Sequence, residues 1–254
     1  MKLTYSILSA VVCCSAFATT LAQDNYSLWP RRPDELEQAR NLLAQQKWGE
    51  AVHLLQPFVH DSGVAGVEAR KITGRVNVVR YLSRMHPYSS VYTVKRGDTL
   101  PKIASSTKCP TDLLMLYNGL VTPSALKVGQ KLVYIEMSLR VEIYLALNEL
   151  TVWDGESLVA SYKIEAIKGI SENISRNSAT TVSSRESYIQ GKKIPQQAAQ
   201  SAVADKSLRL ADGVIVSASD DGLPSCIRLS AKDVNELSQL IRVGNEVKWM
   251  ESPL

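Results

Sequence analysis

The sequence predicts a multidomain α+β protein: an α-helical hairpin, a small strand–helix–helix–strand (βααβ) domain and a mostly-β domain. Three patterns predict this: helical spacing of apolar residues within 34–86, a compact βααβ pattern within 91–136, and strict alternation of apolar residues from Leu139 onward. The composition, 45% hydrophobic and 21% charged, is that of a soluble folded protein. It excludes a wholly disordered chain, a collagen and a polytopic membrane protein.

The formal net charge of +4 is mild. It does not indicate nucleic-acid binding, which needs a concentrated basic face. Residues 91–135 hold the basic surplus, with 6 basic and 2 acidic side chains, whereas residues 139–254 carry 13 and 15. This surplus is either a solvated face or a field that attracts an anionic polymer such as cell wall. The absence of a phosphate-cradling glycine-rich loop argues against a nucleotide partner.

Residues 1–22 are typical of an export signal. Lys2 supplies the positive end, and the apolar stretch Ile7–Ala18 is too short to span a bilayer comfortably. Small residues precede the predicted cleavage point after Ala22. The alternative is an uncleaved membrane anchor.

Cleavage would leave two cysteines in the mature chain, Cys109 and Cys226. They can pair in an oxidising compartment, but sequence alone does not show whether their geometry permits it. The chain has no Cys-x-x-Cys motif and only three histidines, so neither a structural zinc site nor another cofactor is expected.

The helical segment over residues 34–86 is predicted from its apolar periodicity. Asp34 is expected to cap the first helix, Gln46–Gly49 to form a turn, and Val64–Met85 to form a third helix. The helical-spacing residues are Ala39, Leu42, Leu43, Ala51, Val52, Leu55, Phe58 and Val59. The stretch 39–58 resembles one tetratricopeptide helical hairpin, which leaves two roles open: a helical spacer or a docking platform for an envelope protein.

Residues 91–136 contain tight turn signals between short strands and helices. Val91–Val94 alternates as a strand, and Arg96–Leu100 turns into a helix that Asp98 or Thr99 is expected to cap. Pro110 opens a second helix, which Gly119 ends in a left-handed conformation before a last strand.

This segment closely resembles the LysM domain through its Tyr-Thr-Val, Gly-Asp-Thr-Leu, Asn-Gly-Leu and Leu-x-Val-Gly-Gln-Lys-Leu motifs. The resemblance implies binding to N-acetylglucosamine-containing glycans, here peptidoglycan. It places the sugar between two loops, with Leu100 covering the acetamide methyl group. The implied glycan-binding residues are Gly97, Asp98, Thr99, Leu100, Asn118, Gly119, Leu120 and Val121. The alternative is that Gly97, Asp98 and Asn118 serve only as turn and cap residues. Cys109 is expected to be a small core residue.

Residues 138–254 are predicted to be mostly strand. Leu139–Leu147 alternates strictly, and a turn at Asp154-Gly155 continues a β-meander. Near the end, Cys226–Ser230 precedes a helix over Ala231–Ile241 and a closing turn and strand.

The opening hairpin and the Cys226–Ser230 region resemble the L,D-transpeptidase (YkuD-like) catalytic domain, whereas residues 169–211 match it poorly. The resemblance implies acyl transfer through a thioester on Cys226, with Arg228 as the basic residue two positions later. Such a nucleophile needs a base or a cation that lowers the thiol pKa.

The C-terminal segment departs from the family motif Ser-His-Gly-Cys, since Leu223-Pro224-Ser225 precedes Cys226. The family's upstream His-Gly would fall near Val216-Ser217. His53, His60 and His86 all precede the LysM-like segment, so residues 139–254 contain no histidine. The nearby acids Asp212, Asp220 and Asp221 would raise a thiol pKa rather than lower it.

We therefore expect an exported protein in the periplasm or cell wall of a bacterium. Its LysM segment would bind peptidoglycan, and its transpeptidase-like domain would be an inactive wall- or partner-binding module. Two alternatives remain: an active L,D-transpeptidase that uses Cys226, and an envelope scaffold that binds no glycan.

Overall fold

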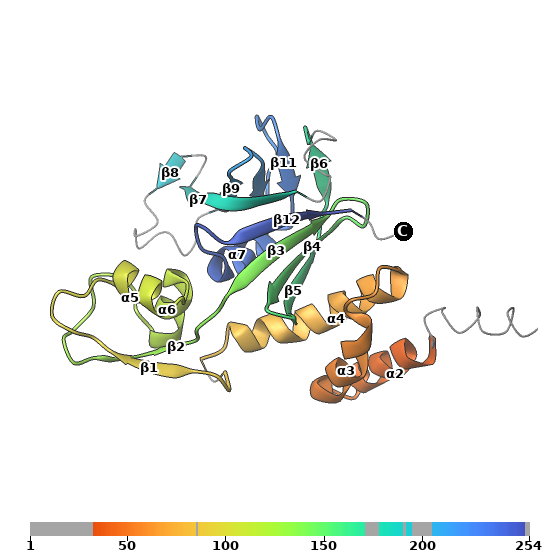
Figure 1. The fold of residues 1–254 in the computed structure, drawn as a ribbon, viewed down its shortest axis with the longest axis horizontal. Helices are drawn as coiled ribbons and strands as arrows, with labels where there is room; N and C mark the ends of the chain where they lie inside the picture. The colour runs from red at the N-terminus through yellow and green to blue at the C-terminus, as the bar shows by residue number, and fades with distance from the viewer. Residues whose placement is uncertain (1–32, 85, 171–177, 190–191, 195–204, 252–254) are drawn as a thin grey trace, which may run out of the picture.

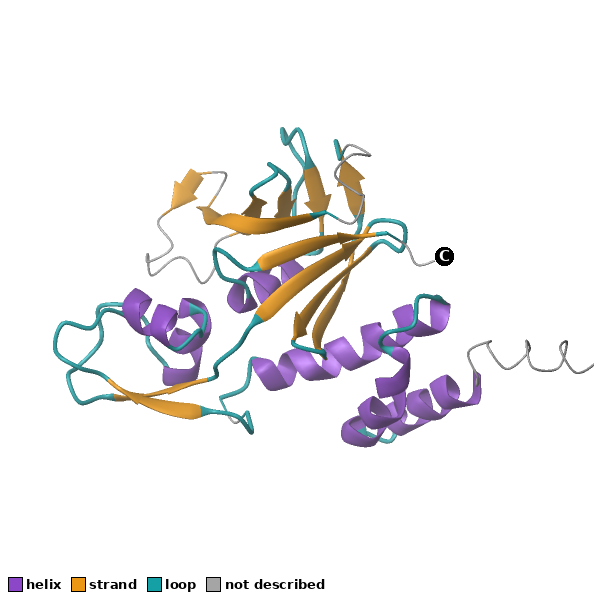
Figure 2. Ribbon diagram, viewed as in Figure 1, coloured by secondary structure: helices purple, strands orange, loops and turns teal. Residues whose placement is uncertain are grey.

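The computed structural model describes residues 33–84, 86–170, 178–189, 192–194 and 205–251. The predicted export signal lies outside these residues, as do parts of the poorly matched stretch 169–211. The described chain contains N-terminal helices, a small two-stranded unit and a large sheet (Figures 1 and 2). The predicted mixed α+β fold is confirmed.

The N-terminal helices are α2 (Pro33–Ala44), α3 (Trp48–Leu55) and α4 (Val64–Tyr81), with a 3-10 turn over Gln56–Phe58 between the last two. Their shared core contains Ala39, Ala51, Leu55, Phe58 and Ala69. The predicted Asp34 cap is wrong, because the helix already begins at Pro33 and Asp34 lies in its first turn. Its negative charge still favours that end of the helix dipole.

The LysM-like unit has the expected βααβ order. Its elements are β1 (Ser90–Thr93), α5 (Leu100–Ser106), α6 (Thr111–Asn118) and β2 (Lys131–Tyr134). β1 and β2 pair antiparallel, with Ser90 opposite Tyr134. Gly119 ends α6 at φ 60°, as the sequence predicts.

The C-terminal sheet has ten strands in the order β5-β4-β3-β12-β7-β9-β10-β11-β6, with β8 paired to β7. The strands are β3 (Leu139–Tyr144), β4 (Glu149–Asp154), β5 (Ser157–Lys163), β6 (Ala166–Lys168), β7 (Ala179–Ile189), β8 (Lys192–Ile194), β9 (Asp205–Leu210), β10 (Ile215–Ser217), β11 (Cys226–Arg228) and β12 (Glu246–Met250). The helix α7 (Ala231–Leu240) follows β11. The strand predicted over Leu139–Leu147 ends at Tyr144, because the next residues form a turn in which Asn148 has φ 50°.

α4 joins the helical segment to the C-terminal sheet and runs along β5 (Figure 1). A side chain at Gly74 would place its Cβ 2.5 Å from the Ser161 backbone nitrogen, so only glycine allows this close approach. The Asn77 amide donates to the Leu158 carbonyl at 2.7 Å. The α4 helix therefore packs on the neighbouring sheet as well as on the hairpin.

The LysM-like unit also packs against its neighbours. Its core residues belong to one continuous cluster with the C-terminal sheet. Arg185 of β7 forms an ion pair with Asp112 of α6, and the Tyr117 hydroxyl donates to the Tyr81 carbonyl at the end of α4. These contacts fix the orientation of the unit relative to both α4 and the sheet.

Candidate functional site

The turn between β1 and α5 is held by the Asp98 carboxylate. Its Oδ2 accepts from the Lys95 backbone amide at 2.7 Å and from the Tyr92 hydroxyl at 2.9 Å. The Lys95 hydrogen bond is the main reason why the pKa of Asp98 lies below its usual value. Gly97 allows the turn with φ 85°. This arrangement leaves the backbone around Gly97 and Thr99 exposed.

The predicted helix cap in this turn is wrong. Thr99 occupies the position before α5 but makes no side-chain cap hydrogen bond, and both Asp98 hydrogen bonds lie outside the helix. Tyr92, which the sequence indicates only as part of the Tyr-Thr-Val motif, is therefore part of the turn. No local sequence signal distinguishes that role from an ordinary strand tyrosine.

Asn118 fastens the second loop to the last strand of the unit. Its amide donates to the carbonyls of Leu114 and Val133, and its side-chain oxygen accepts from the Val133 amide, each at 2.8 Å. These three hydrogen bonds occupy the Asn118 side chain within the fold. The alternative structural role proposed for Asn118 is therefore present in this geometry.

Leu100 differs from its expected role. It is 1% exposed and belongs to the hydrophobic core, so its side chain does not cover an acetamide methyl group at the surface. Val121 is 77% exposed, whereas Leu120 packs partly against the core. Of the apolar side chains predicted to meet the sugar, Val121 is thus the accessible one.

Cys109 and Cys226 are both buried and not bonded to each other. Cys109 is fully enclosed in the core, as expected. Burial raises its pKa to about 11. It is therefore a neutral thiol at physiological pH and packs as a small apolar side chain.

Cys226 begins β11 and lies between β10 and β6. Its Sγ lies 3.4 Å from the Ser217 hydroxyl oxygen and 3.7 Å from the Ser219 carbonyl oxygen. The Ser217 hydroxyl itself donates to that carbonyl. The Cys226 thiol also donates to the Ser219 carbonyl, and either atom can be the donor between Cys226 and Ser217. Burial is the largest cause that raises the pKa of Cys226. The Ser217 hydrogen bond lowers that pKa, but burial outweighs it and the neutral thiol is favoured.

The family's upstream histidine would fall near Val216-Ser217. In this structure, the side chain at that place that contacts the Cys226 sulfur is Ser217. β10 and β11 are parallel, with Ile215 opposite Cys226 and Ser217 opposite Arg228. Two of the chain's histidines contact aromatic rings elsewhere. The ring centroids of His60 and Trp153 are 5.1 Å apart, and those of His86 and Tyr81 are 4.7 Å apart. No residue in the described neighbourhood of Cys226 supplies an imidazole base.

Arg228 projects toward acids rather than acting on the sulfur alone. Its guanidinium lies 3.3 Å from Asp220 and 3.7 Å from Glu165. The positive charge of Arg228 lowers the pKa of Cys226, but burial and the negative charge of Asp220 both outweigh it. Both acids precede Cys226 in the chain. Ser217 lies where the family's histidine would fall, whereas no sequence pattern indicates Ser219 or Glu165.

The other two acids do not replace a base. Asp212 accepts from the Trp249 indole nitrogen at 2.9 Å and from the Val214 amide at 3.2 Å. Asp221 accepts a hydrogen bond from the Ser219 hydroxyl at 3.0 Å.

Within the described ranges, no group of three or more His, Cys, Asp or Glu residues could hold a metal ion. The same residues include no helix long and apolar enough to cross a membrane.

Comparisons with known proteins agree with the LysM resemblance, since residues 92–133 match the LysM domain. Comparison with curated proteins finds no match.

Solved structures similar to this chain include L,D-transpeptidase 1 from Mycobacterium tuberculosis, at 14% identity, a TM-score of 0.31, and coverage of 48% of this chain and 66% of that one. An L,D-transpeptidase from Xylanimonas cellulosilytica matches at 16% identity and a TM-score of 0.31, covering 44% of this chain and 60% of that one. A fused Zn-dependent amidase/peptidase/peptidoglycan-binding domain-containing protein from Clostridium acetobutylicum matches at 11% identity and a TM-score of 0.31, covering 62% and 64%. This chain thus spans less than two thirds of each of these structures. Similarity at this level does not transfer their activities.

Proposed function

We propose that this protein is an exported cell-envelope protein that binds peptidoglycan through its LysM unit, while its C-terminal domain binds the wall or a partner without catalysing acyl transfer. The observation that carries the second half is the closed environment of Cys226. The residue is 1% exposed, and its sulfur has a hydroxyl and a carbonyl oxygen as polar neighbours at hydrogen-bond distance.

The glycan-binding half rests on the LysM match and on the exposed turn around Gly97 and Thr99. Backbone amides and carbonyls there suit the acetamide group of an N-acetyl sugar. The exposed Val121 side chain suits its methyl group. Asp98 and Asn118 hold the two loops, and Leu100 supports them from the core.

The non-catalytic half follows from the chemistry of sulfur nucleophiles. General-base assistance contributes roughly 10²–10⁴-fold to such reactions. Cys226 has no imidazole neighbour in the described structure, and its pKa is raised. Arg228 is already paired with Asp220 and Glu165. The thiolate fraction at neutral pH is therefore small.

The first test incubates the mature protein with a carbapenem and measures its intact mass, in the Cys109→Ala background so that any adduct reports Cys226. We expect no carbapenem adduct and slow alkylation by iodoacetamide. Cys226→Ala serves as the control that accepts neither reagent. A stoichiometric carbapenem adduct that is lost in Cys226→Ala would identify an activated nucleophile and overturn the non-catalytic half.

The second test measures co-sedimentation with purified peptidoglycan sacculi. We expect retention of the wild type, weakening for Val121→Ser, and no change for Val128→Ser, a matched valine that is 71% exposed. Soluble N-acetylglucosamine oligomers should compete. Absence of wild-type retention would overturn the glycan-binding half and favour a non-binding scaffold.

A further inference from the structure

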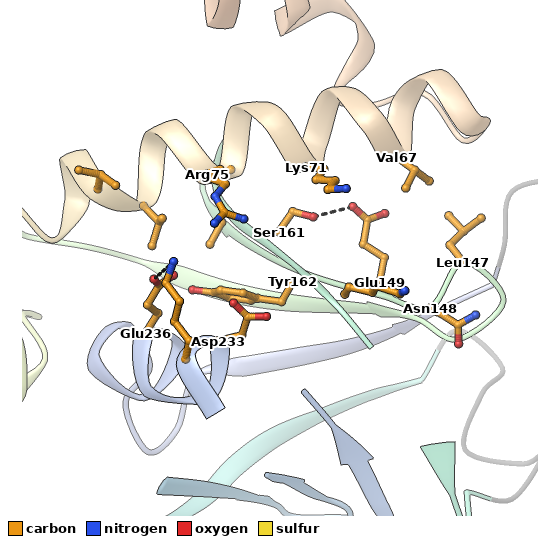
Figure 3. Close-up of a pocket in the computed structure, with 16 residues that line it drawn as sticks. Val67, Lys71, Arg75, Leu147, Asn148, Glu149, Ser161, Tyr162, Asp233 and Glu236 are labelled. Atoms are coloured by element: carbon orange, nitrogen blue, oxygen red, sulfur yellow. Dashed lines mark hydrogen bonds and ion pairs between the residues drawn. The ribbon is translucent and has the colours of Figure 1, made fainter. Parts of the chain in front are cut away.

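A cavity of about 490 Å³ lies between α4, the β4–β5 hairpin and α7 (Figure 3). Its size falls within the range of small-molecule sites, roughly 300–1,000 Å³. Neither Cys226 nor any residue of the LysM unit lines it. The cavity is therefore distinct from the LysM unit and from the surroundings of Cys226.

The helices that line this cavity differ in charge. α4 contributes Lys71 and Arg75, whereas α7 contributes Asp233, Glu236 and Lys232 (Figure 3). Lys163 of β5 adds a further cation to the lining. Glu236 pairs with Lys232 of its own helix at 3.5 Å. No ion pair joins the two walls among the described residues, so the charges of Lys71, Arg75 and Asp233 are available to a ligand.

Glu149 also lines the cavity, but its carboxylate is already occupied. Arg70 donates two hydrogen bonds to Glu149 Oε2, at 2.7 and 3.0 Å, and Ser161 donates to Oε1 at 2.8 Å. Both members of the Arg70–Glu149 ion pair are buried. This pair holds α4 to the sheet and so fixes the position of the basic wall.

Tyr162 of β5 provides a polar group with no partner. It lines the cavity, and Figure 3 shows its ring between α4 and α7. The residue is 3% exposed, and its hydroxyl has no hydrogen-bond partner within the described structure. A buried hydroxyl without a hydrogen-bond partner is unfavourable for the folded protein. A ligand polar atom that reaches this hydroxyl after a small movement of the cavity wall would satisfy it.

The Tyr162 hydroxyl is neutral at physiological pH. Burial raises its pKa well above the usual value, and the negative charges of Glu236 and Asp233 raise it further. The group can therefore donate one hydrogen bond and accept another.

We propose that this cavity binds a short zwitterionic peptide, with its carboxylate toward Lys71 and Arg75 and its ammonium group toward Asp233 and the Tyr162 hydroxyl. The unpaired charges of the lining are of both signs, with Lys71, Arg75 and Lys163 against Asp233, and a zwitterion complements both signs at once. The volume accommodates a peptide of a few residues. This site does not depend on glycan binding or on the state of Cys226.

The test uses trialanine as the probe and follows backbone amide chemical shifts of the full mature chain. We expect saturable shifts at Lys71, Arg75 and Asp233. N-acetyl-trialanine lacks the ammonium group and trialanine amide lacks the carboxylate, and each should bind at least about tenfold more weakly, because a hydrogen bond to a charged group contributes about 1.5–3 kcal/mol. Equal binding of the blocked peptides, or no saturable shift, would overturn the proposal.

Three variants complete the test. The double variant Lys71→Gln, Arg75→Gln should lose at least about tenfold in affinity, and Tyr162→Phe should weaken binding without loss of stability. Arg80→Gln, an exposed α4 residue outside the cavity, should bind as the wild type does. Unchanged affinity in the double variant, or in a folded Tyr162→Phe protein, would contradict the assignment. Sacculus retention should be unaffected throughout, which separates this site from the glycan site.

Discussion

The turn at Gly97–Leu100 and the strand at Cys226–Arg228 both carry residues that a family resemblance marks as functional, but they differ in their surroundings. The turn is closed by hydrogen bonds from Tyr92 and Lys95, and its backbone remains exposed. The Cys226 sulfur is enclosed by chain segments at Ser217 and Ser219.

A sequence motif that resembles a family therefore does not by itself form a functional site. The LysM turn depends mainly on local contacts, so its sequence suffices to form it. A thiol nucleophile needs an accessible sulfur and a base, and the described surroundings of Cys226 provide neither.

Leu100→Ala should lower the free energy of unfolding by about 2–5 kcal/mol, because Leu100 is a core residue of the LysM unit. The matched control Val121→Ala, at an exposed position, should change it by less than about 0.5 kcal/mol. Urea denaturation followed by circular dichroism provides the measurement. A nearly neutral Leu100→Ala variant that loses sacculus retention would instead make Leu100 a contact residue.

Asp98→Asn should lower the thermal midpoint of unfolding at neutral pH. It should also make that midpoint less sensitive to a fall in pH. The pKa of Asp98 in the folded protein is depressed, mainly by the Lys95 amide, so its stabilising effect is complete above the unfolded-state pKa of about 3.9. That effect is lost as the pH falls through the folded-state pKa. Melting curves between neutral pH and acid should therefore converge for the two proteins. Glu37→Gln, at an exposed position on α2, serves as the control, and parallel wild-type and Asp98→Asn curves would contradict the role of Asp98.

Arg228→Gln should have the smallest effect. Its ion pairs are partly exposed, so the loss of stability should be about 0–1 kcal/mol. Because the Arg228 charge lowers the pKa of Cys226, its removal should slow alkylation by iodoacetamide slightly. The rate is measured in the Cys109→Ala background, with Lys248→Gln as the control. A large loss of reactivity would show that Arg228 activates the Cys226 thiol, which would contradict the non-catalytic assignment of this region.

Short-range features could be predicted from the sequence. The order of the LysM elements follows from strand alternation and turn residues, and the left-handed Gly119 follows from the turn chemistry of glycine. The start of the helix after Ser230 is also a local feature. The Ser230 side chain accepts a hydrogen bond from the Asp233 amide and so caps the helix.

The candidate sites could be predicted only in part, because their decisive contacts join distant residues. Asn118 is a loop residue by its neighbours in sequence, but its side chain bonds Val133 across the unit. Leu100 adjoins an exposed turn, but the fold places it in the core. Burial depends on which elements pack together, and local sequence patterns do not specify that.

The sequence alone determined that this protein has a LysM unit and that its C-terminal segment lacks any histidine near Cys226, because both are properties of residue identity and short spacing. Only the tertiary structure decided that Ser217 contacts the sulfur and that Tyr162 lies between α4 and α7. Elements more than sixty residues apart along the chain meet around Tyr162. Their juxtaposition follows from the packing of the whole sheet and its covering helices.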